Sequence, residues 1–423
     1  MDIYWGLVMI MKNILWIVNI PFADAPSLFN LSKTPYGGWL LGYLKETRND
    51  NKITVAFPLK NRAVSDFKFK DGVSYVSFPF NLSRQKVNSI LDKVQPDVIH
   101  LHGTEFKYSY LFFIEAKRRN INVVVSIQGL VSEYSKYLSA DLPLRVVYGS
   151  SIRNLLNQDA VYQISKSFRK RGKNEIQILN NSDVVIGRTD WDYAVTRYVA
   201  KNDKYQHVEE ILRSEFYFHK WNYISGNNTI YISQATYPIK GTHYFLKALF
   251  LLKAKIPDIV AYIGGKNIMK CDSLKDKLLQ TKYSKYIKKL IRIYDLEKNV
   301  IFLGPRNANE VAELLSKVSV FVSPSSIENS SNSIAEAMLV GTPIVASDVG
   351  GTNSLIKHNE NGLLYQHNSE VMLALLIEKI FNDKDLSQRL SNHARETALY
   401  RHNAQTAGSK INDIYKNFPT IKL

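Results

Sequence analysis

PSSIENSSNSIAEAM, residues 324–338, is the stretch that says most about how this chain folds. The apolar run Val320–Ser323 precedes it and predicts a buried strand, whereas Ala335–Met338 predicts a helix. The polar residues Asn329–Ser333 therefore lie where that helix begins. A helix N-terminus presents unpaired amide groups and a positive dipole end, and both favour the binding of a phosphate.

Three charged residues are candidate ligands near this helix start. Glu328 lies in the loop, where it can reach sugar hydroxyls, and Glu336 lies about one turn inside the helix, where it can reach the paired hydroxyls of a ribose. Lys240, in TYPIKG (residues 236–241), follows another predicted strand and can neutralise a diphosphate leaving group as a point charge. Taken alone, these motifs also fit an ordinary capped helix and a solvated lysine.

Short apolar runs alternate with longer helical segments along most of the 423 residues. This alternation predicts parallel sheets with helices on both faces, and the length favours two lobes. The alternation stops across residues 202–228, so we place the boundary between the lobes near residue 222. The predicted strands are Ile14–Asn19, Ile53–Phe57, Val73–Phe78, Val98–His102, Val123–Gln128, Val184–Arg188, Thr229–Ser233, Ile259–Gly264, Val300–Gly304, Val320–Ser323 and Ile344–Ser347.

Ligands of such sheets bind beyond the C-terminal ends of the strands, so the site should lie in a cleft between the lobes. Gly37 and Gly38, in TPYGGW, allow a phosphate to approach the backbone closely, although most glycine pairs are plain turns. His102 ends a predicted strand facing the cleft, on the same side as His100, although such a histidine is more often structural. The GxGxxG pattern of a nicotinamide site is absent.

The net charge of +17 predicts an anionic partner, which the charge alone does not identify. The basic run at residues 166–173 predicts a helix that lies on anionic lipid, but a generally basic surface fits equally well. No zinc spacing or RNA-recognition motif supports nucleic acid. Residues 1–10 are too short to span a bilayer and are either an upstream extension or part of the first strand. The single cysteine fits a reducing cytoplasm.

Together these motifs resemble the retaining family-4 glycosyltransferases of the GT-B fold, from Met11 to the C-terminal helix. The seven residues between Glu328 and Glu336 are the specific part of the likeness, which is greatest for bacterial enzymes of capsule, exopolysaccharide or O-antigen assembly. The resemblance implies two Rossmann-like domains facing a central cleft. Residues 1–221 would bind the acceptor and residues 222–399 the donor, with a helix at about 400–423 packing back on the first domain.

The resemblance also implies a role for each matching residue. The implied catalytic residues are His102, Lys240 and Glu328, and the implied donor-binding residues are Gly37, Gly38, Arg188, Lys240, Glu328, Ser331, Asn332, Ser333 and Glu336. Many relatives carry an arginine before the Lys-Gly pair, where this chain has Gln234 and Ala235. Either Lys240 acts alone, or another base such as Arg188 or Arg306 assists it.

The implied reaction moves a sugar from a UDP- or GDP-sugar to a glycan or a polyprenyl-diphosphate-linked glycan, without a metal or other cofactor. Two DxD triplets, Asp190–Asp192 and Asp383–Asp385, stand outside the pattern of metal-dependent transferases. The implied location is the cytoplasm or the inner face of the membrane. Two alternatives stay open, which are a sugar-nucleotide epimerase and a non-catalytic nucleotide-binding partner of a polysaccharide assembly complex.

Overall fold

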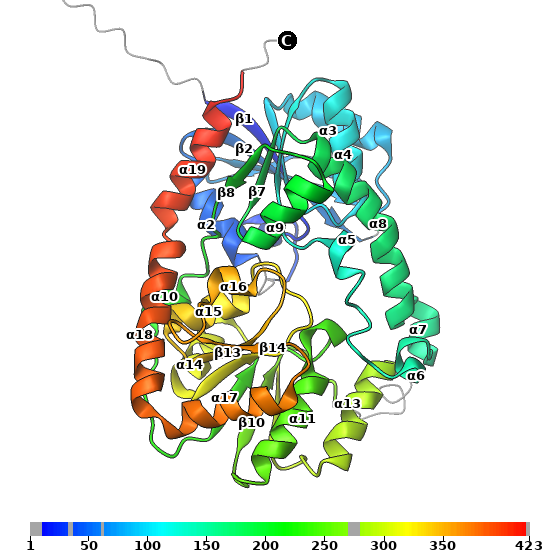
Figure 1. Cartoon of the computed structure of the whole chain (residues 1–423). Coiled ribbons are helices and arrows are strands. Elements are labelled where there is room, and N and C mark those ends of the chain that lie inside the picture. Colours follow the sequence, from blue (N-terminus) through cyan, green and yellow to red (C-terminus); the bar gives the residue numbers. More distant parts are fainter. Residues whose placement is uncertain (1–10, 33–36, 61–62, 270–279, 420–423) are drawn as a thin grey trace, which may run out of the picture.

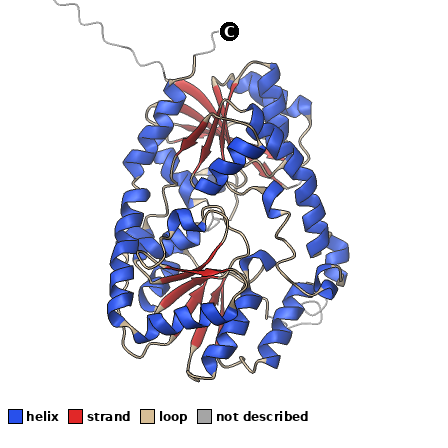
Figure 2. Ribbon diagram, viewed as in Figure 1, coloured by secondary structure: helices blue, strands red, loops and turns tan. Residues whose placement is uncertain are grey.

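The computed structural model describes residues 11–32, 37–60, 63–269 and 280–419, and it places two α/β lobes one above the other (Figure 1). The prediction for residues 1–10 lies outside the described residues. In each lobe, helices cover the faces of a central sheet (Figure 2). The strand order of the N-terminal sheet is β3-β4-β2-β1-β5-β6-β7-β8. Its strands are β1 (Lys12–Ile17), β2 (Asn51–Leu59), β3 (Lys68–Lys70), β4 (Val73–Pro79), β5 (Val98–His102), β6 (Asn122–Ser126), β7 (Val184–Gly187) and β8 (Tyr205–His207).

The strand order of the C-terminal sheet is β11-β10-β9-β12-β13-β14, and all its described pairings are parallel. Its strands are β9 (Thr229–Ile232), β10 (Val260–Gly264), β11 (Val300–Gly304), β12 (Val320–Ser323), β13 (Ile344–Asp348) and β14 (Leu363–Gln366). Every predicted run forms a strand, whereas β3, β8 and β14 were missed. The sheets are parallel as predicted, apart from β3, an exposed edge strand that pairs antiparallel with β4.

The helices fill both faces of each sheet. Those before the interlobe crossing are α1 (Ala25–Leu28), α2 (Gly38–Thr47), α3 (Arg84–Val94), α4 (Lys107–Arg118), α5 (Val131–Tyr134), α6 (Leu144–Val147), α7 (Ile152–Asn157), α8 (Val161–Asn181) and α9 (Asp190–Ala194). Those after it are α10 (Glu215–Phe218), α11 (Thr242–Lys253), α13 (Lys282–Ile293), α14 (Ala308–Lys317), α15 (Asn332–Val340), α16 (Thr352–Leu355), α17 (Glu370–Asn382), α18 (Lys384–Arg401) and α19 (Ala404–Lys416).

The apolar cores show where the chain crosses from one lobe to the other. Ile211 packs in the N-terminal core, while Leu212 packs in the C-terminal one. Phe216 and Trp221 also belong to the C-terminal core, and the Trp221 indole donates to the Val318 carbonyl at 2.7 Å. The packing therefore places the crossing between Ile211 and Leu212, which is N-terminal to the predicted boundary near residue 222. Phe216 and Trp221 already belong to the core of the second lobe.

Two segments pack away from the lobe that their position in the sequence suggests. Leu142, Val146 and Val147, from the N-terminal half, pack in the C-terminal core. In the opposite direction, α19 returns to the N-terminal lobe and packs against α2. There the buried Tyr415 hydroxyl accepts from the Trp16 indole at 3.0 Å. The lobes are thus also connected by chain segments outside the crossing near residue 212.

Candidate functional site

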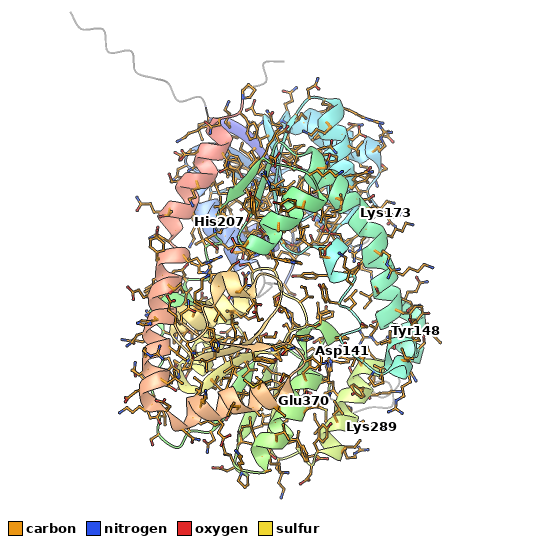
Figure 3. All side chains as sticks on the ribbon, in the orientation of Figure 1. Asp141, Tyr148, Lys173, His207, Lys289 and Glu370 are labelled. Carbon is orange, nitrogen blue, oxygen red and sulfur yellow. The ribbon has the colours of Figure 1, made fainter. Side chains whose placement is uncertain are left out.

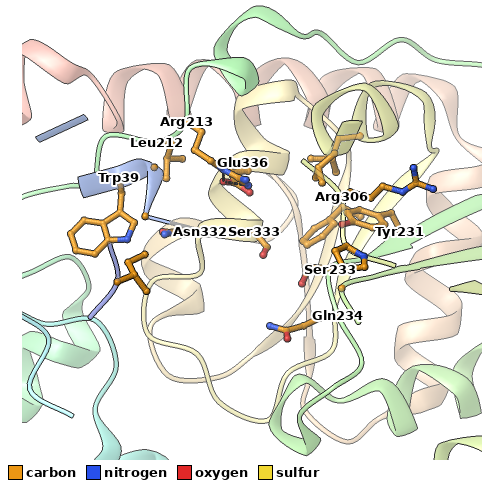
Figure 4. Close-up of a pocket in the computed structure, with 18 of the residues that line it drawn as sticks. Trp39, Leu212, Arg213, Tyr231, Ser233, Gln234, Arg306, Asn332, Ser333 and Glu336 are labelled. Atoms are coloured by element: carbon orange, nitrogen blue, oxygen red, sulfur yellow. Dashed lines mark hydrogen bonds and ion pairs between the residues drawn. The ribbon is translucent and has the colours of Figure 1, made fainter. Parts of the chain in front are cut away.

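A cavity of about 490 Å³ lies between the lobes, where the strands of the C-terminal sheet end (Figure 4). Gly37, Gly38 and Trp39 line it from the N-terminal lobe. Ser233 and Gln234 follow β9, Gly265 follows β10, and Pro305 and Arg306 follow β11, so the strand-end rule accounts for this wall. The start of α15 supplies Asn332, Ser333 and Glu336. The cavity is therefore lined by both lobes, as a cleft between two such sheets requires.

Two helix N-termini face this cavity. Gly37 caps α2 with a left-handed φ of +85°, and a Cβ on Gly38 would lie 2.1 Å from Arg213 Cγ, so both positions require glycine. Ser331 caps α15, and its side chain makes no capping hydrogen bond to the first-turn amides. Each helix end carries roughly half a positive elementary charge, so the pair favours an anion in the cavity.

The carboxylate of Glu336 is paired with Arg213, a residue of the interlobe crossing. Arg213 Nε and Nη2 lie 2.8 and 2.7 Å from Glu336 Oε1. The guanidinium also stacks over the Phe216 ring, 4.7 Å from its centroid, and this contact fixes its plane. Burial raises the pKa of Glu336 above its ordinary value, and the positive charge of Arg213 opposes that rise. Arg213 thus limits the rise that burial causes in the pKa of this carboxyl group at the cavity wall.

Lys240 and Glu328 form a second pair at the same sheet edge, but neither lines the cavity. Lys240 Nζ lies 2.5 Å from Glu328 Oε1, which also accepts from the Ser325 hydroxyl at 2.7 Å. Gly241, with φ +72°, fixes this loop, because a Cβ there would lie 1.7 Å from the Pro324 carbonyl oxygen. The structure therefore brings the two predicted residues together, each as the partner of the other.

His102 does not reach the cavity. It is only 2% exposed, and the rings of Trp16 and Trp39 enclose it with centroids at 4.7 and 5.5 Å. Its ring lies 3.9 Å from that of His100, so the two share one side of β5, as predicted. Burial lowers the pKa of His102 well below its ordinary value and keeps it neutral. The expectation that it faces the cleft is wrong, because Trp39, itself a cavity residue, packs against it.

Arg188 is also buried away from the cavity. Its guanidinium pairs with Glu210 and donates to the Ile127 carbonyl at 2.6 Å. The neighbouring Thr189 hydroxyl donates to Asn329 Oδ1 at 2.8 Å, across the two lobes. Thr189 therefore joins the lobes, and Arg188 is not among the residues that line the cavity. Of the two predicted substitutes for the missing arginine, only Arg306 lines the cavity.

Both DxD triplets lie at helix starts. Asp192 belongs to a capping box with Thr189, and Asp383 caps α18 by accepting from the Leu386 amide at 2.8 Å. Within the described ranges, no group of three or more His, Cys, Asp or Glu side chains is placed to hold a metal ion. In this structure Asp192 and Asp383 therefore act as helix-capping residues.

Arg213 is the cavity residue that the sequence analysis missed entirely. Ser233, Gln234, Gly265 and Pro305 were also unassigned, but Ser233 ends a predicted strand and the other three directly follow one, so the strand-end rule could have found them. No such signal marks Arg213, which reaches the cavity from the crossing between lobes rather than from a strand end.

Comparison with known proteins agrees with this architecture. Residues 214–397 match the family model "Glycosyl transferases group 1". YtcC of Bacillus subtilis is 26% identical over 187 residues, 44% of either chain. D-inositol 3-phosphate glycosyltransferase of Corynebacterium urealyticum is 24% identical over 183 residues, 43% of this chain and 41% of that one. These matches span less than half the length of either relative.

The fold as a whole is also shared with solved structures. Anabaena HepE, in complex with UDP and glucose, superposes with a TM-score of 0.67 over 96% of this chain and 100% of its own, at 16% identity. The chain thus has the GT-B fold, with two Rossmann-like α/β lobes and a cavity between them, and its residues 214–397 match the model of the glycosyl transferases group 1 family.

Proposed function

We propose that the chain is a glycosyltransferase that moves a sugar from a nucleoside diphosphate sugar to a hydroxyl group of an acceptor. The observation that carries this proposal is the interlobe cavity, where two helix N-termini lie beside a carboxylate paired with an arginine. The helix ends suit a diphosphate, and the carboxylate suits the hydroxyls of a ribose. A solved structure of the same fold holds UDP and glucose, which supports this class of donor.

In the proposed reaction, the bond between the anomeric carbon and the β-phosphate oxygen breaks as the acceptor oxygen attacks on the same face. The acceptor proton passes to the departing phosphate oxygen. The amides at the start of α15 stabilise the negative charge that develops there, and Lys240, which rests on Glu328 at the same sheet edge, adds its positive charge from outside the cavity lining. Glu336 is the one carboxylate among the described cavity-lining residues, and it is held by Arg213. This favours retention by direct same-face attack over a covalent intermediate on the enzyme.

The direct test of this function combines binding with product analysis. UDP, GDP and ADP are compared by thermal shift, since a nucleotide at 100 times its dissociation constant adds about 2.7 kcal/mol of stability. The nucleotide that stabilises the chain is then supplied as its sugar, with and without glycan acceptors. Transfer with retained anomeric configuration is expected. Conversion of the donor without an acceptor would indicate an epimerase, and binding without conversion would indicate a non-catalytic partner.

We also propose that the acceptor is lipid-linked and that the chain meets it on an anionic membrane. The short helices α6 and α7, together with the residue that follows α6, expose four large apolar side chains, with exposed fractions from 64% to 74%: Leu144, Tyr148, Leu155 and Leu156. Exposed bases flank them on α8 and α13, namely Lys166, Arg169, Lys170, Lys173, Lys285, Lys289 and Arg292. Figure 3 shows Tyr148, Lys173 and Lys289 along one edge of the molecule. In the described residues, no helix is long and apolar enough to cross a bilayer.

Vesicle flotation tests the membrane proposal. Each base near an anionic surface contributes ~1 kcal/mol, and each inserted leucine ~1.5–3 kcal/mol. The double variant Leu155→Ser/Leu156→Ser is expected to reduce binding to phosphatidylserine vesicles at low salt. The control Phe218→Ser changes an exposed apolar residue on another helix, α10, and should bind as the parent does. Equal flotation of all three proteins would contradict the proposal.

A further inference from the structure

We infer that Arg213 is the cation that binds the donor's diphosphate. It would replace the arginine that many relatives carry where this chain has Gln234 and Ala235. This inference rests on the proposed function. Those two positions follow β9, where relatives carry an arginine, and neither side chain here is charged. Arg213 enters the same cavity from the opposite direction, out of the crossing between lobes. An arginine in this place would contact the donor itself.

The geometry of the guanidinium supports a second anionic partner. Nε and Nη2 both donate to Glu336 Oε1, which uses one edge of the guanidinium group. In the described part of the chain, no hydrogen bond engages Nη1, so the other edge is open. Gly38 lies against the side-chain stem, since a Cβ there would be 2.1 Å from Arg213 Cγ. Arg213 therefore lies between the start of α2 and Glu336, and its side chain is still 23% exposed.

The Glu336 carboxylate is left with a matching free oxygen. Its Oε1 accepts both bonds from Arg213, and its Oε2 accepts none from the described residues. A ribose hydroxyl can therefore donate to Oε2 while a phosphate oxygen accepts from Nη1. Arginine is suited to this arrangement because its planar group offers five donors in a fixed geometry. The ion pair can thus bind the ribose through Glu336 and the diphosphate through Arg213.

The other two arginines considered for this role, Arg188 and Arg306, are placed less well. Arg188 is buried on Glu210, outside the cavity. Arg306 lines the cavity, but it pairs with Glu310 on the surface of α14, and both side chains are more than 40% exposed. In Figure 4 Arg306 lies beside Tyr231, whereas Arg213 lies directly beside Glu336. Arg306 is therefore the matched control, as a second arginine of the same cavity.

The experiment compares Arg213→Met and Arg306→Met with the parent chain by calorimetric titration of UDP, GDP, uridine and guanosine. Removal of a hydrogen bond to a charged group costs ~1.5–3 kcal/mol, so Arg213→Met should weaken diphosphate binding by about tenfold to a hundredfold. Its affinity for the matching nucleoside should fall far less. Arg306→Met should leave the preference for diphosphate over nucleoside unchanged. Arg213→Lys, which keeps the charge, should restore part of that preference and also serves if Arg213→Met fails to fold.

Four other results would overturn the inference, and each would point to a different explanation. If the parent binds neither nucleotide nor nucleoside, the proposed function fails together with the inference. If Arg213→Met binds the diphosphate as the parent does, the function stands and Arg213 has no part in phosphate binding. If diphosphate and nucleoside weaken equally, Arg213 acts only by holding Glu336. If Arg306→Met alone loses the preference, Arg306 holds the phosphate.

Discussion

Two acid–base pairs lie at the edge of the C-terminal sheet, and they differ in how the chain brings their partners together. Lys240 and Glu328 lie on neighbouring loops after β9 and β12, and their contact stays outside the cavity. Glu336 also comes from this lobe, but its partner Arg213 arrives from the crossing between lobes, and both line the cavity. The first pair is local to one lobe, whereas the second depends on how the two lobes meet.

We therefore expect the two pairs to act at different stages. The Arg213–Glu336 pair binds the donor before the reaction, and Lys240 acts when the leaving group departs. Lys240→Met should then lower kcat about 10²- to 10³-fold and change the donor KM little, because loss of one such electrostatic group costs ~2.7–4 kcal/mol in the transition state. Steady-state kinetics measure both constants. Lys317→Met, which removes a lysine from a Lys–Glu pair on the surface of α14, should have no effect. A near-native kcat for Lys240→Met would remove it from catalysis.

The second prediction tests how firmly the Lys240 loop is held. Gly241→Ala should destabilise the fold by roughly 3 kcal/mol, since a left-handed φ alone costs ~1–3 kcal/mol for a residue with a Cβ. The methyl group would also lie 1.7 Å from the Pro324 carbonyl oxygen. Gly226→Ala is the control, because Gly226 has the same φ of +72° and open space around it. Denaturant unfolding should show a clearly smaller loss for Gly226→Ala, and equal losses would mean that the Pro324 contact is unimportant.

The third prediction concerns pH and the cavity pair. Because burial raises the pKa of Glu336, the folded chain binds that proton more tightly than the unfolded chain. The resulting stabilisation is complete below the unfolded pKa and is lost as the pH rises through the folded pKa. Arg213 limits this loss by lowering the pKa of Glu336. Arg213→Met should therefore destabilise the chain more at about pH 8 than at about pH 5, by ~1 kcal/mol after allowance for solvent screening.

Denaturant unfolding of the parent and Arg213→Met at the two pH values measures this difference. The double variant Arg213→Met/Glu336→Gln carries no titrating group at the pair, so the extra loss at high pH should disappear. A destabilisation of Arg213→Met that is independent of pH would show that Arg213 contributes through packing on Phe216 rather than through its charge.

The sequence predicted those features that depend on neighbouring residues in the chain. The strands around residues 324–338 and the start of the helix that contains Glu336 are predicted by local apolar periodicity and by the polar residues between the apolar runs. Cavity residues directly after β9, β10 and β11 follow from the same pattern once the sheet is known. The site residues that the resemblance implied stay predictions, and the structure groups only part of them around the cavity.

The remaining features depend on contacts between distant segments. Trp16 and Trp39 close over His102 from separate parts of the chain, so its burial has no local signal. Arg213 belongs to a short irregular crossing, and only the packing of both lobes brings it to Glu336. The return of α19 to the N-terminal lobe, marked by Tyr415, was implied by the resemblance, but no local signal in the sequence predicts it.

A crystal structure of the chain with UDP bound tests the central claim most directly. We expect the diphosphate between the N-termini of α2 and α15, within hydrogen-bond distance of Arg213, and the ribose hydroxyls on Glu336. A nucleotide bound outside the interlobe cavity, or one in the cavity with its phosphates turned away from both helix ends, would contradict it.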